Sequence, residues 1–450
     1  MMAPVIRTMQ TRSLALGIGM LVMAAAAVAQ TTAGEVEFSR GVGFAQTPGQ
    51  TPRTLGKGLP LREGDRLTTS EGGSAIIKLE DGTRMTVRPN SELVLQQYKF
   101  AADATDNSLV MQLLRGGMRA VTGLIAKSSP NAARIQTNTA TIGIRGTDFD
   151  ARVCARDCGT ESAKVADKSR PNAVQASAKV VSAQGQLEAV DGGGTRRRLV
   201  DGGSVYPGDL VETAAGTRAV LAFRDDSRVT LGSGTRFRVD NFVYDDKNPG
   251  EGRFLVSLLR GSVRALTGLI GKTNTRNVGF ATATATVGIR GTGLDLDCND
   301  NGCSYFTWLG SIVVTPNGGT ALDALLAGQG LFVGQGGIRP LTGSTIEDLP
   351  RPDGVTVDVK QLFSSNDVAE DQEGLFVFVR DGHIEIATTR EILHLGKGEA
   401  GFAGDNGSTA RPNQIPKFLD FDKMPLPNSR NPMLSSLLGE SGIRASNQCN

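Results

Sequence analysis

The sequence predicts an all-β protein, and three observations support this fold class. Glycine accounts for 57 of the 450 residues, well above the usual share of about 7%, and these glycines separate short apolar runs. Apolar and polar residues alternate through many of the runs, which is typical of strands with one buried face. One stretch occurs twice, as Ala140–Thr147 and Ala285–Thr292, and seven of its eight positions are identical. A repeat of this kind indicates that one structural unit is duplicated.

The duplication extends beyond this stretch. Leu113–Gly116 matches Leu258–Gly261, and Thr122–Ile125 matches Thr267–Ile270, both at a spacing of 145 residues. Because single hydrophobic cores seldom exceed roughly 250 to 300 residues, a chain of 450 residues accommodates two such units and a remainder. We therefore expect two tandem β domains of short antiparallel strands and a smaller C-terminal β unit.

Residues 1–29 have the pattern of a secretory signal. Arg7 and Arg12 precede the apolar run Leu14–Val28, and small residues up to Ala29 mark a cleavage site. The alternative is an uncleaved membrane anchor. No later segment is apolar enough to span a bilayer, so we expect an exported protein of the periplasm or cell surface, without a transmembrane segment after cleavage.

The charge composition argues against nucleic acid as a partner. The chain has 48 Lys and Arg against 46 Asp and Glu, and removal of a leader that contains Arg7 and Arg12 leaves the two signs equal. A nucleic-acid-binding domain usually carries a basic patch and a high isoelectric point.

The first repeat is placed at residues 35–158 and contains a hairpin in Ala75–Arg88. A three-residue loop at Glu80–Gly82, with Gly82 left-handed, pairs Ile77 with Met85 and puts the apolar pair inward. A two-residue loop would mix apolar and charged residues on both faces, so the longer loop is predicted.

The second repeat is placed at residues 179–340, after a polar linker at 159–178. Its hairpin spans Ala219–Leu231, and Asp226 replaces Gly82. Aspartate tolerates the left-handed region better than most residues, so the same turn is expected. One additional residue lies in the polar loop 245–251, because the spacing between the repeats grows there from 144 to 145.

The remainder divides into three parts. Residues 341–373 are interpreted as a connector with a short helix near Val359–Phe363. Residues 374–404 are expected to form a small β unit with a turn at Asp381–Gly382. Residues 405–450, rich in Pro, Asn, Ser and Gly, are expected to be a flexible tail.

Four of the five cysteines lie in two close pairs after the repeated stretch, and we expect each pair to form a disulfide in an oxidising compartment. A metal site would need four ligands, and no further Cys or His lies near either pair. Cys449 is left over. The predicted disulfides join Cys154 to Cys158 and Cys298 to Cys303.

Three other patterns have simpler explanations. Gly271–Thr273 resembles part of a phosphate-binding loop, but its first glycine is replaced by Leu266. Asp297–Gly302 has the oxygen spacing of a calcium loop, but Trp308 stands at the twelfth position, where glutamate is expected. Arg196–Arg198 is a run of three cations, most simply a solvated face. We predict no metal and no cofactor.

The two histidines, His383 and His394, do not indicate a catalytic site. Alternation would put His383 and Glu385 on one face, yet no serine or cysteine nucleophile motif accompanies them. We therefore predict a protein without enzymatic activity.

The repeated Ile-Arg-Gly-Thr motif is interpreted as structural. Its arginine, near the end of a strand, could bind a carboxylate or backbone carbonyls as a fork, and Asp81 and Asp225 are the first candidates for the carboxylate. The alternative is that the arginine presents a charge to a partner. The motif residues are Arg145, Gly146 and Thr147 in repeat one and Arg290, Gly291 and Thr292 in repeat two.

These residues resemble the FecR domain family, the periplasmic part of iron-responsive regulators of an alternative sigma factor. The matching series runs from a Gly-Asp and Thr opening through the Asp-Gly-Thr turn and Leu-Arg-Gly to Ile-Arg-Gly-Thr, over residues 35–155 and 179–305. The opening is Gly64, Asp65 and Thr69 in repeat one and Gly208, Asp209 and Thr213 in repeat two.

The resemblance implies a cytoplasmic sigma-binding segment, one membrane helix and one periplasmic domain. Here a signal is expected in place of the first two, and the domain is doubled, so the sigma-control mechanism is not carried over. We expect a non-catalytic binding or scaffold protein whose partner is an envelope protein or the cell wall, engaged through sheet edges and loops. The alternative is a periplasmic signalling component that senses an outer-membrane receptor and passes the signal to a separate membrane partner.

Overall fold

A computed structural model describes residues 32–420 except 103, 105, 129–131 and 347. The predicted signal and residues 421–450 lie outside this part. Strands dominate it and the helices are short, which confirms the all-β class. No helix among the described residues is long and apolar enough to cross a membrane. The helical segments are α1 (Leu124–Ser128), α2 (Cys158–Ala163), α3 (Leu269–Thr273), α4 (Val359–Leu362), η1 (Pro249–Glu251), η2 (Thr275–Asn277), η3 (Pro352–Gly354) and η4 (Lys417–Asp420).

Each repeat contributes to one sheet of 15 strands. The strands of the first sheet are β1 (Thr32–Arg40), β2 (Gly43–Gln46), β3 (Arg53–Thr54), β4 (Pro60–Arg62), β5 (Arg66–Thr69), β6 (Ser74–Leu79), β7 (Arg84–Val87), β8 (Glu92–Lys99), β9 (Ser108–Val121), β10 (Ala133–Gln136), β11 (Thr141–Cys154), β28 (Gly374–Ala387), β29 (Ile392–Gly396), β30 (Ala400–Gly404) and β31 (Thr409–Ala410). The strands of the second sheet are β13 (Ala178–Gln184), β14 (Leu187–Val190), β15 (Arg196–Leu199), β16 (Ser204–Val205), β17 (Leu210–Thr213), β18 (Arg218–Phe223), β19 (Arg228–Leu231), β20 (Arg236–Val243), β21 (Arg253–Leu266), β22 (Val278–Thr282), β23 (Ala285–Asn299), β24 (Gly302–Pro316), β25 (Leu325–Leu326), β26 (Gly330–Gly334) and β27 (Gly337–Leu341).

The long strands of repeat one bend at glycines, so each contributes to two parts of the sheet. The first half of β9 pairs with β8 and β10, and its second half pairs with β7 and β11. Gly116, with φ 76°, marks the change. Its counterpart in β21 is Gly261, with φ 85°. Only glycine adopts such a backbone without strain, which explains why the Leu-Arg-Gly motif occurs in both repeats.

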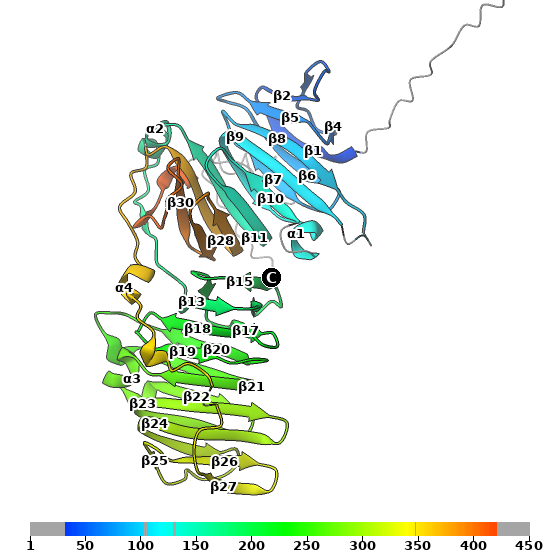
Figure 1. Ribbon diagram of the computed structural model, residues 1–450. Helices are drawn as coiled ribbons and strands as arrows, with labels where there is room; N and C mark the ends of the chain where they lie inside the picture. The colour runs from blue at the N-terminus through cyan, green and yellow to red at the C-terminus, as the bar shows by residue number, and fades with distance from the viewer. Residues whose placement is uncertain (1–31, 103, 105, 129–131, 347, 421–450) are drawn as a thin grey trace, which may run out of the picture. The chain divides into compact units, whose positions relative to one another are not determined.

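The segment expected to form a separate β unit belongs to the sheet of repeat one. β28 pairs antiparallel with β11 from Thr141 opposite Ala387 to Cys154 opposite Gly374 (Figure 1). The predicted turn at Asp381–Gly382 is also wrong, because Gly382, with φ 86°, is a bend within the continuous strand β28. Repeat two therefore lies, along the chain, between the two parts of the first sheet.

The strands β28 to β31 repeat the arrangement of β24 to β27. β24 pairs with β23 as β28 pairs with β11, and β24 bends at Gly310, with φ 70°. In repeat two, a tight turn at residues 300–301 joins β23 directly to β24. In repeat one the chain leaves the sheet at Cys154 and returns at Gly374.

The predicted hairpin register is confirmed. Ile77 lies opposite Met85 and Lys78 opposite Arg84, Gly82 has φ 84°, and the apolar pair is buried. In repeat two, Asp226 adopts the same left-handed conformation, with φ 64°.

Segments expected to be irregular carry more structure than predicted. The linker contains α2 and the short strand β12 (Arg170–Pro171), which pairs with β32 (Gln414–Ile415). Asn172 Nδ2 donates to the carbonyl oxygen of Ala400 over 2.8 Å. In the predicted tail, Phe418 and Leu419 are buried. These segments pack because Phe418 closes a small cluster with Phe376 and Phe402.

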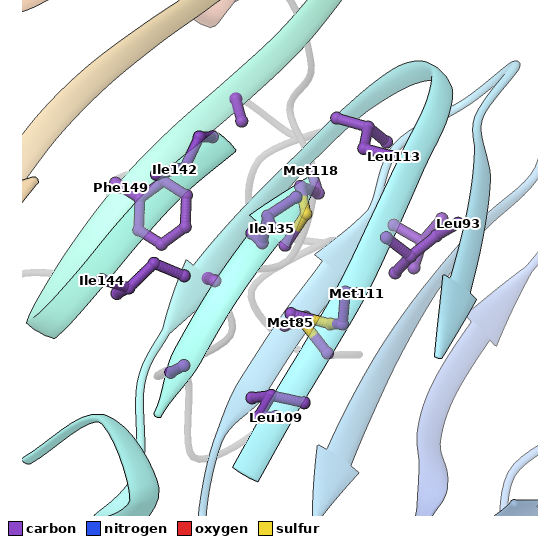
Figure 2. Packing of buried hydrophobic residues seen from close by; sticks show 14 of the residues in the cluster. Met85, Leu93, Leu109, Met111, Leu113, Met118, Ile135, Ile142, Ile144 and Phe149 are labelled. Atoms are coloured by element: carbon purple, nitrogen blue, oxygen red, sulfur yellow. The ribbon is translucent and has the colours of Figure 1, made fainter. Parts of the chain in front are cut away.

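Each sheet encloses its own hydrophobic core. In repeat one, Met85, Met111, Met118, Ile135 and Phe149 project from β7, β9, β10 and β11 into one interior (Figure 2). In repeat two, phenylalanines from β18, β20, β21 and β22 occupy the corresponding interior. Burial of these side chains is the main stabilising contribution to the fold.

Candidate functional site

The glycine and threonine of the Ile-Arg-Gly-Thr motif form the bend of β11 and β23. Gly146 and Gly291 both have φ 56°. Thr147 Oγ1 donates to the His383 carbonyl over 2.8 Å, which ties β11 to β28 at the bend. Thr292 Oγ1 donates in the same way to Ser311 of β24 over 2.9 Å. These two glycines and two threonines thus form and stabilise the bends of β11 and β23.

In repeat two, the arginine of the motif does not have the partner we expected, and the side chain of its counterpart Arg145 lies outside the part that the structure describes. Arg290 is exposed, and no ion pair joins it to another residue in the part of the chain that the structure describes. Asp225 instead accepts hydrogen bonds from Ser227 Oγ at 2.8 Å and from the backbone N–H of Ile270 at 3.4 Å. Burial raises the pKa of Asp225. This aspartate holds the hairpin turn against α3, and Asp81 does the same against α1.

Both predicted cysteine pairs lie at bonding distance. The Cα atoms of Cys154 and Cys158 are 5.6 Å apart, and those of Cys298 and Cys303 are 4.1 Å apart. The first pair joins the end of β11 to α2, and the second links β23 to β24. Among the described residues, only the first pair, with Asp157, forms a group of three possible metal ligands.

The run Arg196–Arg198 is not one solvated face. Arg197 is buried and forms an ion pair with Asp209 through both terminal nitrogens. Asp209 belongs to the Gly-Asp opening, and its counterpart Asp65 pairs with Arg53 at 2.6 Å. Alternation along β15 turns the middle arginine inward, as the period of a strand dictates. The opening motif is therefore structural in both repeats.

The remaining sequence candidates also occupy structural positions. Gly271–Thr273 ends the five-residue helix α3, and Asp297–Gly302 forms the tip that joins β23 to β24. His383 Nε2 lies 3.2 Å from His394 Nδ1, and Glu385 lies opposite His394 in the ladder. The structure thus gathers these last three side chains at β28 and β29.

One cavity, of about 900 Å³, lies at the hairpin end of repeat two. This volume falls within the ~300–1,000 Å³ of small-molecule sites. We call it the repeat-two cleft. Its lining comes from the linker, the hairpin turn, the loop after β20, the start of α3 and the connector: Val174, Arg224, Asp226, Arg228, Tyr244, Asp245, Asp246, Leu269, Val357, Asp358, Val359, Lys360 and Phe363.

The arginines of the cleft are already engaged. Arg224 donates to the carbonyl oxygens of Val174 and Tyr244, the latter at 2.6 Å. Arg228 pairs with Asp226 at 3.0 Å and donates to the Val355 carbonyl at 2.5 Å. These bonds attach the linker and the connector to the hairpin and give the cleft two of its walls.

Most of the charged groups of the cleft that remain available to a ligand are exposed carboxylates. Asp245 and Asp246 lie on the exposed loop after β20. A backbone N–H from Lys247 lowers the pKa of Asp245, which keeps it ionised. Burial, with the charges of Asp225 and Asp246, raises the pKa of Tyr244, so its hydroxyl remains a donor. Lys360 supplies one exposed cation.

The sequence did not reveal this cleft, because the connector that walls it lies more than 100 residues beyond the hairpin. The only local signal was the additional residue in the loop 245–251. Repeat one differs there, since Phe100, Ala101 and Ala102 occupy the positions of Tyr244 and the two aspartates. The duplicated units have therefore diverged at the cleft while they keep the same bends and ion pairs.

Two segments of the chain, residues 65–167 and 209–312, match the model of the family described as FecR protein. No curated protein matches the chain significantly. Two crystal structures of a protein from Parabacteroides distasonis ATCC 8503, described as an anti-sigma factor, are similar at 18% identity and a TM-score of 0.25. In each case the similarity covers 30% of this chain and 60% of the other.

Proposed function

This chain carries two tandem FecR-like domains, and from this premise we propose that it is an exported, non-catalytic binding protein of the cell envelope. Its motif residues form bends, turns and buried ion pairs, and these roles recur in both repeats. The cleft, by contrast, is formed in repeat two, where the connector packs against the hairpin. The difference between the duplicated units at this position is the observation that carries the proposal.

The cleft suits a segment of a partner protein with apolar and basic side chains. Val174, Leu269 and Phe363 offer apolar surface, and Leu269 is 40% exposed. Asp245 and Asp246 add negative charge at the rim, while the two arginines are bound to carbonyl oxygens or to Asp226. Complementary charge favours encounter and orientation more than affinity, so the apolar surface is expected to supply the binding energy.

Sheet edges are a weaker candidate for the docking surface. The edge strand β27 is mostly exposed, but it contains Arg339 and Pro340. A charged side chain and a residue without an N–H are features by which natural edge strands resist pairing with a further strand. The cleft is therefore preferred over the edge of repeat two.

The experiment is photo-crosslinking in intact cells. A photoreactive amino acid replaces Asp246 in one tagged variant and Ala102 of repeat one in the other, and adducts are identified by mass spectrometry. We expect a discrete protein adduct from position 246 and none from position 102. Charge reversal by Asp245→Lys should reduce the adduct. Equal labelling from both positions, or recovery of cell-wall fragments alone, would contradict the proposal.

A second candidate is the signalling role, which the family match favours. Recovery of an outer-membrane receptor or a membrane-anchored regulator from position 246 would identify this role. Recovery of other envelope proteins would identify a scaffold.

A further inference from the structure

A buried polar cluster lies where the start of repeat two contacts the strands that complete the first sheet. We call it the joint cluster and define it as Lys179, Arg197, Tyr206, His394, Glu399 and Arg411. Tyr206 Oη donates to Glu399 Oε2 over 3.0 Å, and the backbone N–H of Gln175 donates to Glu399 Oε1 over 2.8 Å. Glu399 thereby joins the linker and repeat two to the turn between β29 and β30.

Several donors in the cluster have no acceptor. The Nε atoms of Arg197 and Arg411 are buried and bond to none of the described residues. The ammonium of Lys179 lies 5.7 Å from the centre of the Phe363 ring and is attracted by the charge of Glu399, but no described residue accepts a hydrogen bond from it. These three residues are 7%, 4% and 8% exposed, respectively. Buried donors without an acceptor are rare in folded proteins, because each one costs free energy.

His394 adds a fourth unpaired atom. Its ring is 1% exposed, and its Nδ1 lies 3.2 Å from His383 Nε2. When His383 donates in this contact, neutral His394 carries its proton on Nε2. That atom also bonds to none of the described residues. Burial and the charges of Arg197, Arg411 and Lys179 lower the pKa of His394 to about 3, so the ring is neutral at physiological pH.

The cluster carries an excess of positive charge. Asp209 neutralises Arg197 in a close ion pair. Glu399 is then the one carboxylate of the cluster itself, and its charge acts on Lys179. Arg224, whose charge also acts on Glu399, increases the excess. Glu385 lies opposite His394, but it contributes little to neutralising the cluster. Burial raises the pKa of Glu385, and its carboxylate interacts with Arg198, which is not a member of the cluster. An uncompensated charge in such a place is strongly destabilising.

We propose that the joint cluster binds one small inorganic anion, held by the Lys179 ammonium and Arg411 Nε with His394 Nε2–H as an additional donor. The anion accepts from three of the four unpaired donors and neutralises the excess charge, whereas a water molecule could accept hydrogen bonds but could not neutralise the charge. Its binding stabilises the contact between repeat two and the first sheet. The site adjoins the repeat-two cleft at Phe363 and Arg224. Its donors are not the cleft's exposed aspartates, so the anion response and the crosslink from position 246 test the two proposals separately.

The test is thermal unfolding of the purified full chain at constant ionic strength, with chloride or phosphate replacing gluconate. A ligand that binds only the folded state raises stability as the logarithm of its concentration above Kd. We expect a rise of several degrees in Tm for the wild type. The anion that raises Tm more is the preferred ligand.

Lys179→Met and Arg411→Met should lose this response, and Lys360→Met, an exposed lysine of the cleft, should keep it. Lys179→Met should also be more stable than the wild type in gluconate, because it removes a buried charge. If either variant does not fold, bromide soaked into wild-type crystals gives an anomalous peak within hydrogen-bond distance of Lys179 when the proposal is correct. No anion response in the wild type, an unchanged response in Lys179→Met, or bromide peaks elsewhere alone would overturn it.

Discussion

Tyr206 packs its ring over Gly396 and donates a hydrogen bond to Glu399, so that a residue of repeat two completes a turn of the first sheet. A Cβ atom at position 396 would lie 2.5 Å from the Tyr206 ring. The counterparts of Gly396 and Glu399 in repeat two are Leu326 and Gln329. In both turns the backbone N–H of the first residue donates to a side-chain oxygen of the second over 2.8 Å. Leu326 is 57% exposed. The two turns thus differ where one of them receives the tyrosine.

Gly396→Ala should destabilise this contact by about 1–3 kcal/mol, the usual cost of overpacking a well-filled site. Unfolding in denaturant measures the change. The control is Leu326→Ala, which should stay within about 0.5 kcal/mol because the side chain is exposed. In a Tyr206→Ala background the cost of Gly396→Ala should disappear, and a cost that persists there would refute the steric explanation.

Arg197→Met should cost about 3–5 kcal/mol, because it leaves the carboxylate of Asp209 buried without its partner. Arg198 is exposed, and its charge acts on the half-buried Glu385. Arg198→Met should therefore change stability by no more than about 1 kcal/mol, the usual range for an exposed pair. Chemical denaturation distinguishes the two variants. Equal effects would mean that the run acts as one solvated face, as its sequence suggested.

Gly291→Ala should destabilise the protein by about 1–2 kcal/mol, the cost of a left-handed backbone for an L-residue. No atom lies within 4 Å of the added Cβ, so the effect isolates the backbone conformation of the bend. Gly288→Ala on the same strand is the matched control. It also meets no atom within 4 Å and lacks a positive φ, so it should be neutral or slightly stabilising.

The stability difference between Lys179→Met and the wild type should depend on pH. Burial, with repulsion from Arg411, lowers the pKa of Lys179 from 10.5 to about 7. The folded wild type therefore bears the full cost of the charged lysine below pH 7, and this cost fades as the pH rises towards 10.5. Unfolding free energies at pH 7, 8 and 9 in gluconate should converge for the two proteins. A constant difference would mean that Lys179 titrates normally.

Much of the local structure could be predicted from the sequence. The alternation of residues around Glu80–Gly82 determined the hairpin register, since a shift by one residue would expose Ile77 and Met85. The left-handed Asp226 followed from its alignment with Gly82. The duplication itself indicated two FecR-like domains, because residues such as Gly116 and Gly261 recur where each long strand bends.

The tertiary structure decided which distant segments meet. The alternation in β28 shows which of its faces is buried but not which strand it joins, because every strand edge offers the same backbone donors and acceptors. Only the fold shows that β28 pairs with β11 across the whole of repeat two. The same reason explains why the cleft and the joint cluster escaped prediction. Phe363 and Glu399 reach Lys179 and Tyr206 from some 200 residues away, and no local pattern of apolar and polar residues records such a contact.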